Sequence, residues 1–184
     1  MTDMTARRGV RKTMPRTSDP TRSVAIDLAI PCAKWRRALS DAETVATEAA
    51  RAALKHSGKK FGAAELSLIL SDDKTVHKLN AQWRGKDAPT NVLAFASDES
   101  PKGPAPTLLG DVILAYETVK REAKEQGKTL PDHFRHLVIH GVLHLLGYDH
   151  QADREAKKME SLETRILALM GVADPYRVRE NIHG

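Results

Sequence analysis

The sequence predicts an α/β (α+β) fold: a single domain with a roughly four-stranded sheet and helices mainly on one face. Its 184 residues are enough for one ordinary domain with its own core. Four short apolar runs alternate with longer stretches of helical period, an order typical of one sheet covered by helices. We find no internal repeat and no linker that would separate a second domain.

Residues 1–22 predict a disordered basic arm. They lack hydrophobic periodicity, contain two prolines, and carry six basic against two acidic residues, which is +4 of the chain's net charge of +5. The rest of the chain is therefore close to neutral. With aromatic residues at only 4% as well, composition alone does not indicate a nucleic-acid-binding domain.

The first strand and the first helix follow the arm. Val24–Ile30 alternates well enough for a strand, and Pro31 ends it because proline cannot donate to a sheet. Ser40–Glu43 matches a capping box, which predicts the start of a helix. Residues 45–54 give that helix an apolar face, and Gly58 ends it.

A second strand is predicted over Glu65–Leu70. Ser71 or Asp72 can cap a short helix after it, because both side chains accept hydrogen bonds from amides of a first turn. This helix extends to Trp83. Arg84–Thr90 contains a glycine and a proline and is predicted to form a loop.

The third and fourth strands are separated by a long loop. Asn91–Ala96 predicts the third strand and Leu108–Ala115 the fourth. Residues 97–107 hold three prolines and a glycine, which predicts a flexible surface loop. A helix follows from about Tyr116 to Gln126, closed by Gly127.

Two further helices are predicted before a C-terminal tail at residues 173–184. Thr129 and Pro131 begin the first helix, since proline fits the first helical turn. Its apolar stripe is Phe134, Leu137, Val138, Val142 and Leu145. The second helix spans residues 151–170. Its residues at core spacing are Met159, Leu162, Ile166 and Leu169.

The helix that begins at Thr129 carries a histidine motif. His140 and His144 are four residues apart, so they lie on one helix face with Cβ atoms about 5–6 Å apart. Gly147 can leave the helix with a positive φ, and the turn can bring His150 to the same ion. The spacing His-x-x-x-His-x-x-Gly-x-x-His is that of metzincins. Three nitrogen ligands with an open fourth position indicate a catalytic zinc site.

One position of this motif departs from a zinc peptidase. The peptidase has Glu directly after the first histidine, where it acts as the general base for water. This chain has Gly141 at that position. The motif therefore predicts that the chain binds a metal without peptidase activity.

The sequence also predicts the compartment. The single cysteine, Cys32, excludes an internal disulfide and suits a reducing cytosol, where we expect it to be a small apolar core residue. No apolar run approaches the about 18 residues that a membrane span needs, and no signal peptide opens the chain. We expect a cytoplasmic protein with no membrane partner.

Three stretches resemble a known family. His140–His150 reads His-Gly-Val-Leu-His-Leu-Leu-Gly-Tyr-Asp-His, and Asn80–Phe95 reads Asn-Ala-Gln-Trp-Arg-Gly-Lys-Asp-Ala-Pro-Thr-Asn-Val-Leu-Ala-Phe. Gly110–Leu114 reads Gly-Asp-Val-Ile-Leu. On these blocks, residues 23–172 resemble the YbeY endoribonucleases, the bacterial rRNA maturation factors.

The resemblance implies a single-strand-specific, metal-dependent endoribonuclease that acts in small-subunit rRNA maturation and ribosome quality control. It implies one Zn²⁺ per chain, held by His140, His144 and His150, and a functional arginine at Arg84. Single-stranded RNA, small-subunit rRNA in particular, would be the substrate. Small-subunit proteins or ribosome assembly factors would be the protein partners.

The chemistry of the residues agrees with this implication. RNA cleavage builds negative charge on a phosphate, which a guanidinium stabilises better than an ammonium does. Arg84 is therefore the catalytic candidate and Lys86 a possible phosphate-binding helper. Asp149 can either orient a histidine ligand or cap the turn. We expect His136 to support a ligand through a hydrogen bond or to face solvent, and not to be a fourth ligand.

Two alternatives from other classes stay open. The first is a metallohydrolase of peptides or small molecules, against which Gly141 weighs. The second is a non-catalytic ribosome-assembly module in which the metal only stabilises the fold. The open coordination position and Arg84 weigh against that alternative.

Overall fold

The computed structural model describes residues 23–98 and 105–177. The predicted arm at residues 1–22 lies outside these ranges, as do residues 99–104 of the predicted surface loop and the end of the predicted tail, 178–184. The strands are β1 (Val24–Ala29), β2 (Ala64–Ser71), β3 (Val92–Ala96) and β4 (Thr107–Ala115). The helices are α1 (Lys34–Ala38), α2 (Ala42–His56), α3 (Asp73–Arg84), α4 (Tyr116–Glu125), α5 (Leu130–Leu145) and α6 (Asp153–Leu169).

The four strands form one mixed sheet with the order β1-β2-β4-β3. β1 and β4 both run parallel to β2, and β3 runs antiparallel to β4 at the edge. Parallel neighbours need a long crossover, which α1 and α2 supply between β1 and β2. The strand order could not be read from the sequence. It places the short edge strand β3 against α5, the helix with the histidine motif.

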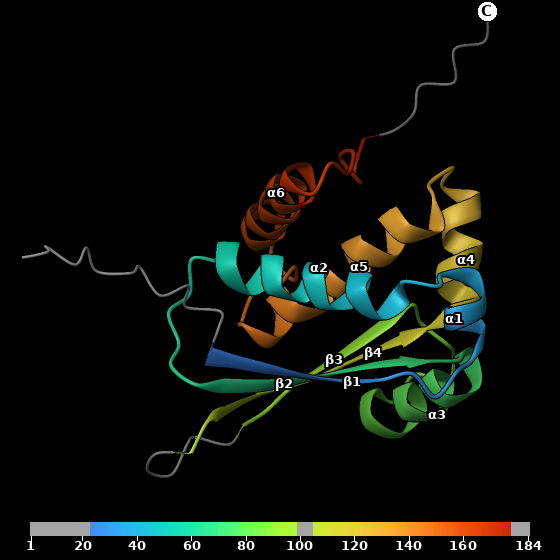
Figure 1. Ribbon diagram of the computed structural model, residues 1–184, viewed down its shortest axis with the longest axis horizontal. Helices are drawn as coiled ribbons and strands as arrows, with labels where there is room; N and C mark the ends of the chain where they lie inside the picture. Colours follow the sequence, from blue (N-terminus) through green and yellow to red (C-terminus); the bar gives the residue numbers. More distant parts are fainter. Residues whose placement is uncertain (1–22, 99–104, 178–184) are drawn as a thin grey trace, which may run out of the picture.

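The main core lies between the sheet and the helices on one of its faces. Figure 1 shows α2 and α5 across this face, with α6 further out. Small side chains allow α2 to approach its neighbours closely, because four of its alanines are fully buried: Ala46, Ala49, Ala50 and Ala53. The buried side of α5 contains Phe134, Val138, Ile139, Val142 and Leu143.

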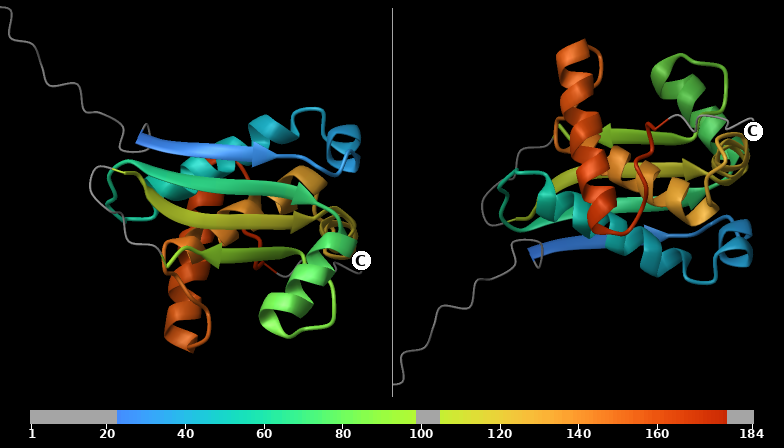
Figure 2. Two further views of the ribbon diagram at one scale, coloured as in Figure 1. Left: turned by 90° about the horizontal axis from the view of Figure 1, so that it is seen from below. Right: turned by 90° about the horizontal axis from the view of Figure 1, so that it is seen from above.

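The opposite face of the sheet carries a smaller core. Val76 of α3 packs there with Leu93, Ile113 and Ala115. Figure 2 shows α3 near one end of the sheet when the molecule is seen from below, and α2, α5 and α6 across the sheet when it is seen from above. The predicted fold class is confirmed: a single α/β domain with a four-stranded sheet and helices mainly on one face.

Three local features differ from the sequence predictions. Helix α1 was not predicted, and it exists because the fully buried Trp35 anchors it by donating to the Ser71 carbonyl at 2.9 Å. The predicted capping box does not form, since α2 begins after Asp41 without a side-chain cap. Leu169 is 65% exposed instead of in the core, because the last turn of α6 buries Leu167 instead.

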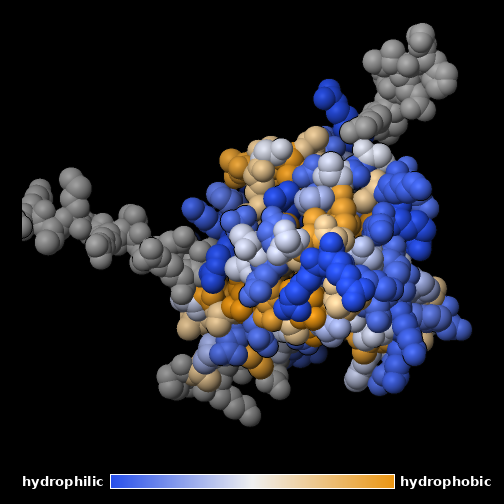
Figure 3. Space-filling model, turned by 45° about the vertical axis from the view of Figure 1, so that its right-hand side comes forward, coloured by the Kyte–Doolittle hydropathy of each residue, from blue (hydrophilic) through white to orange (hydrophobic). Residues whose placement is uncertain are grey.

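The surface gives no indication of a membrane span. Within the described residues, none of the helices has both the length and the apolar character to cross a bilayer. Figure 3 shows hydrophilic side chains over much of one face, with apolar ones between them. Within residues 23–98 and 105–177, the large exposed apolar side chains come from four separate segments, as is usual for single surface residues: Trp83, Leu108, Leu169 and Tyr176.

Candidate metal centre

Helix α5 places two of the predicted ligands side by side. The hydroxyl of Thr129 caps this helix by accepting a hydrogen bond from the Asp132 amide at 3.2 Å. His140 and His144 are about one turn apart, so their rings lie on the same side of the helix, with centroids 4.6 Å apart. Their Nε2 atoms are 3.1 Å apart. Both nitrogens are therefore near enough to contact one ion.

The turn after α5 brings the third histidine to this pair. Gly147 has a φ of 86°, a left-handed conformation that glycine adopts without a Cβ clash. Beyond it, the ring centroid of His150 lies 4.9 Å from that of His144 and 5.7 Å from that of His140. One nitrogen of each ring lies within 4.8 Å of the other two. The structure thus brings together the three residues that the sequence analysis names as ligands.

The donor set fits a tetrahedral metal ion. A carboxylate only accepts, so Nδ1–H of His140 donates to Glu163 at 2.5 Å, and Nε2 of that ring carries the lone pair, which faces Nε2 of His144. Two nitrogens on tetrahedral zinc are about 3.3 Å apart, given Zn–N distances of about 2.0–2.1 Å. The separation of 3.1 Å between the Nε2 atoms of His140 and His144 is close to this value. A group of three histidines could therefore hold one ion here.

The surroundings of His144 favour its neutral ring. Burial lowers the pKa of His144, and the neighbouring His140 and His150 rings lower it further, to about 4, against a smaller opposing effect of the Tyr148 backbone. Neutral imidazole is the form that ligates a metal. At neutral pH, His144 can therefore bind a metal without first losing a proton.

Arg84 lies on the wall of a cavity of about 500 Å³ that the three histidines also line. The loop predicted at this residue is wrong by one position, because Arg84 is the last residue of α3, which Gly85 ends with a φ of 65°. The Arg84 guanidinium donates to the Ala94 carbonyl at 2.8 Å and lies 5.7 Å from the centroid of the Phe95 ring. Lys86 is exposed and does not line this cavity.

Asp149 and His136 occupy different places around the three histidines. Oδ1 of Asp149 accepts from the His150 amide at 2.7 Å but is 3.7 Å from Nδ1 of the His150 ring, which is too far for a hydrogen bond. Of the two roles that the sequence leaves open for Asp149, this geometry matches the turn cap. His136 donates from Nε2 to Glu163 at 2.9 Å. It therefore reaches the candidate ligands through Glu163.

Gly141 packs α5 against the sheet. A Cβ at this position would lie 2.5 Å from Cγ1 of Val112 and 3.3 Å from Cγ2 of Val92. Valine side chains have few alternative rotamers with which to move aside. A glutamate directly after the first histidine would therefore collide with the sheet. The absence of the peptidase base coincides with a packing requirement for glycine.

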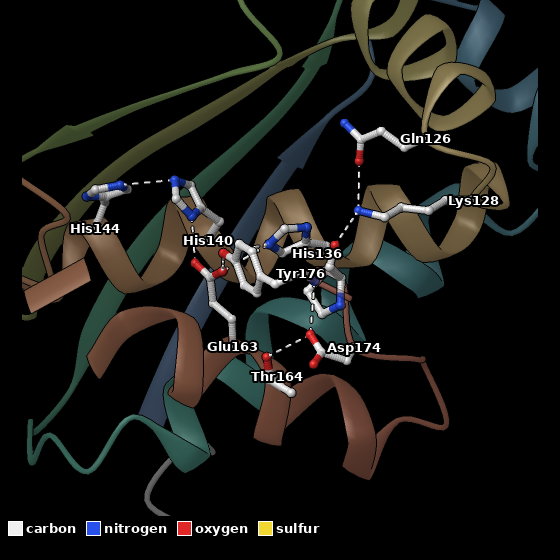
Figure 4. A network of polar contacts seen from close by, with 10 residues as sticks. Gln126, Lys128, His136, His140, His144, Glu163, Thr164, Asp174 and Tyr176 are labelled. Carbon is white, nitrogen blue, oxygen red and sulfur yellow. Dashed lines mark hydrogen bonds and ion pairs between the residues drawn. The ribbon is translucent and has the colours of Figure 1, made fainter. Parts of the chain in front are cut away.

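Glu163 belongs to this centre and was missed by the sequence analysis. Its carboxylate is fully buried on α6 and accepts hydrogen bonds from His140, His136 and Tyr176 (Figure 4). Burial raises the pKa of Glu163, but the hydrogen bonds from the two histidines outweigh it and lower this pKa to about 2. The sequence did contain an indication of this role, because Glu163 is a charged residue beside Leu162, within the predicted apolar stripe.

The chain is similar to a known family and to several of its members. Residues 31–171 match the family model described as Endoribonuclease YbeY. An Endoribonuclease YbeY from Paramagnetospirillum magneticum is 56% identical over 160 residues, which are 85% of this chain and 96% of that protein. One from a Bradyrhizobium species is 47% identical over 174 residues, 92% of this chain and 99% of that protein. The solution structure of TM1509 from Thermotoga maritima is similar with a TM-score of 0.48 and 23% identity, covering 83% of this chain and 99% of that one.

Proposed function

The chain belongs to the YbeY endoribonuclease family, and from that premise we propose that it is a single-strand-specific, zinc-dependent endoribonuclease. Its proposed role is in small-subunit rRNA maturation and ribosome quality control in the cytoplasm. The observation that carries this proposal is the convergence of His140, His144 and His150 within 4.8 Å, in a cavity that Arg84 also lines. Residues 23–172 would form the catalytic unit.

We assign one zinc ion per chain to the three histidines. Nitrogen donors suit zinc, and three protein ligands leave a fourth position for water or substrate. Bound there, the ion would supply a Lewis acid that activates water or polarises a phosphoryl oxygen. The chain itself supplies a neutral His144 and a His140 ring whose Nδ1 is already occupied by Glu163.

Arg84 is the proposed catalytic residue because it can bind the phosphate on which negative charge develops. One of its N–H groups donates to the Ala94 carbonyl, and the Phe95 ring lies beside the guanidinium. These two contacts fix the position of the guanidinium and use only one of its donors. Its other donors are free to form a fork on phosphate oxygens. Lys86 lies outside the cavity, and we assign it at most a contact with a flanking phosphate.

The position of Gly141 weighs against the peptidase alternative. A peptidase needs a carboxylate after the first histidine, and the packing of Gly141 against Val112 leaves no room for one. The non-catalytic alternative is disfavoured by a different observation. A metal that only stabilised the fold would be expected in a closed site with four protein ligands, whereas these three histidines line an open cavity.

The test is cleavage of one RNA sequence offered as a single strand and as a duplex. Zinc-loaded wild type is compared with a variant that has alanine at His140, His144 and His150, and with His56→Ala as a histidine control at the end of α2. We expect cleavage of the single strand by the wild type and by the control alone. Equal cleavage by the triple variant would overturn the proposed site, and zinc-dependent cleavage of casein would favour the peptidase alternative.

A further inference from the structure

Glu163 occupies the junction between α6 and the candidate ligands. We propose that it is a positioning residue: its carboxylate fixes the orientation and tautomer of the His140 ring, and Tyr176 holds that carboxylate in place. The inference rests on the proposed three-histidine metal site. It adds two residues to that site which do not themselves touch the metal.

The hydrogen bonds of Glu163 explain how a carboxylate can be fully buried. An ionised carboxylate away from water is costly unless its oxygens are paired and hydrogen-bonded. Oε1 accepts from Nδ1 of His140 at 2.5 Å, and Oε2 accepts from Nε2 of His136 at 2.9 Å and from the Tyr176 hydroxyl. Figure 4 shows these three side chains around Glu163, with His144 beyond His140. Both oxygens are therefore used.

The same residues could be taken for a second metal site, because His136, His140 and Glu163 also bring three donor atoms within 4.8 Å. The distances decide against it. Two ligands of a tetrahedral ion, each at about 2.0–2.2 Å, are separated by about 3.3 Å. The separations of 2.5 Å and 2.9 Å from the carboxylate to the two rings are those of direct hydrogen bonds. Glu163 is therefore an acceptor for the histidines and not a ligand beside them.

The hydrogen bond to Glu163 determines which nitrogen of His140 is available to a metal. Because the carboxylate can only accept, the His140 proton is on Nδ1, and Nε2 carries the lone pair. That Nε2 lies 3.1 Å from Nε2 of His144, on the side of the three-histidine group. Rotation of the His140 ring would break its hydrogen bond to a residue that cannot follow it, since Glu163 is packed in the core.

Tyr176 connects this arrangement to the segment after α6. Asp174 accepts from the Tyr176 amide at 2.9 Å, and Lys128 donates to the Pro175 carbonyl at 2.8 Å, which ties the segment to the start of α5. From there, the Tyr176 hydroxyl reaches the same oxygen of Glu163 as His136 does. The segment thus limits the movement of the carboxylate that holds His140.

The experiment measures zinc affinity without RNA. Chelator-stripped protein is titrated with zinc against a chromophoric chelator, for the wild type, Glu163→Gln, Glu163→Asp and Tyr176→Phe. The matched control is Glu160→Gln, which removes a carboxylate from an exposed position of the same helix. Loss of a partner behind a metal ligand lowers affinity by about 10–100-fold. We expect this loss in Glu163→Gln, a smaller loss in Tyr176→Phe, partial recovery in Glu163→Asp, and no change above about twofold in the control.

A spectroscopic measurement separates positioning from a purely structural role. In cobalt-substituted protein, the visible absorption bands report the geometry of the ligands. We expect the bands of Glu163→Gln to shift and those of Glu160→Gln to match the wild type. A Glu163→Gln protein with wild-type bands and wild-type zinc affinity, even if its apo form is less stable, would overturn the inference.

Two further outcomes also decide the question. If Glu163→Gln does not fold, Tyr176→Phe takes its place, because it keeps both histidines and the carboxylate, and unchanged zinc affinity in that variant would overturn the inference. A wild-type protein that binds no zinc would instead overturn the three-histidine site itself, and this inference with it. Failure of the positioning role alone would leave tight zinc binding in every variant.

Discussion

Helix α5 carries three histidines that are paired with a glutamate, and two of these pairs, His133–Glu122 and His140–Glu163, differ in the surroundings of the second ring nitrogen. In the first pair, Nε2 of His133 donates to Glu122 at 2.8 Å, and its Nδ1 is buried without a partner among the described residues. In the second pair, Nδ1 of His140 donates to Glu163 at 2.5 Å, and its Nε2 faces His144. We therefore expect the two pairs to serve different purposes, according to what lies beside the second ring nitrogen.

The first pair joins elements of the fold. Glu122 is on α4 and also accepts from the side-chain amide of Asn91 at 2.9 Å, so one carboxylate ties α4, α5 and the start of β3 together. Burial raises the pKa of Glu122, but the hydrogen bonds from His133 and Asn91 outweigh it, and this pKa is lowered. We expect this pair to contribute to stability and the His140 pair to metal binding.

The largest expected effect separates the two pairs directly. His140→Ala removes a proposed ligand and should abolish most zinc binding. Its loss of RNA cleavage should exceed the about 10²–10³-fold that removal of one transition-state donor costs. His133→Ala should keep its zinc, because its ring does not belong to the three-histidine group. Elemental analysis of both variants, purified without chelator, checks this. Full zinc content in His140→Ala would contradict the assignment.

The next largest effect is expected at Arg84, which lines the same cavity as His140. Arg84→Ala should lower single-turnover RNA cleavage by about 10²–10³-fold, while zinc content and melting temperature stay near those of the wild type. Arg84→Lys should recover only part of the rate, because the charge remains but the fork on the phosphate is lost. Arg165→Ala, an exposed arginine on α6, is the control. Cleavage at the wild-type rate in Arg84→Ala would remove this residue from the mechanism.

These variants test residues that the sequence revealed to different degrees. The three histidines could be predicted because they lie within eleven consecutive residues, where helix periodicity and one glycine determine their positions. The role of Glu163 could not, because it depends on a contact between α5 and α6 across 23 positions of sequence. The position of Glu163 in an apolar stripe of the sequence indicates that a buried carboxylate needs a hydrogen-bonding partner, but it does not indicate which residue that partner is.

The same limit applies to the fold. The four strands were predicted close to their observed bounds because each has a local pattern of alternation or apolar residues. The order β1-β2-β4-β3 depends on pairing between distant segments and on the crossovers, and no local pattern encodes it. Helix α1 is only five residues long and is held by the burial of Trp35, so its periodicity was too short to detect.

A smaller effect tests the packing of the helix that holds both pairs. Gly141→Ala places a Cβ 2.5 Å from Cγ1 of Val112, so α5 or the sheet must shift. Overpacking of this kind costs about 1–3 kcal/mol of the free energy of unfolding. Zinc affinity should fall less than in Glu163→Gln, since no donor or hydrogen bond is removed. Urea denaturation measures the loss, with Ala81→Gly on α3 as a control for a change of similar size. Unchanged stability would mean that the contact relaxes without cost.

The smallest effect is expected from the first pair and depends on pH. Glu122→Gln keeps the shape of the side chain but replaces hydrogen bonds to a charged acceptor with weaker ones, at a cost of about 1–2 kcal/mol of the free energy of unfolding. The lowered pKa of Glu122 in the folded state means that the carboxylate stabilises the protein fully above its ordinary pKa of 4.5. This contribution decreases once the pH is below 4.5, and it is lost when the pH is also below the lowered pKa of Glu122 in the folded protein.

The difference in stability between the wild type and Glu122→Gln should therefore be largest at neutral pH and shrink below pH 4.5. Urea denaturation at several pH values measures it, with a chelator present so that metal release does not contribute. Zinc affinity at neutral pH should stay within about twofold of the wild type, well short of the about 10–100-fold loss expected for Glu163→Gln. A large loss of affinity in Glu122→Gln would show that the two pairs act together, through α5 or through Asn91, which donates to Glu122 and lines the cavity of the three histidines.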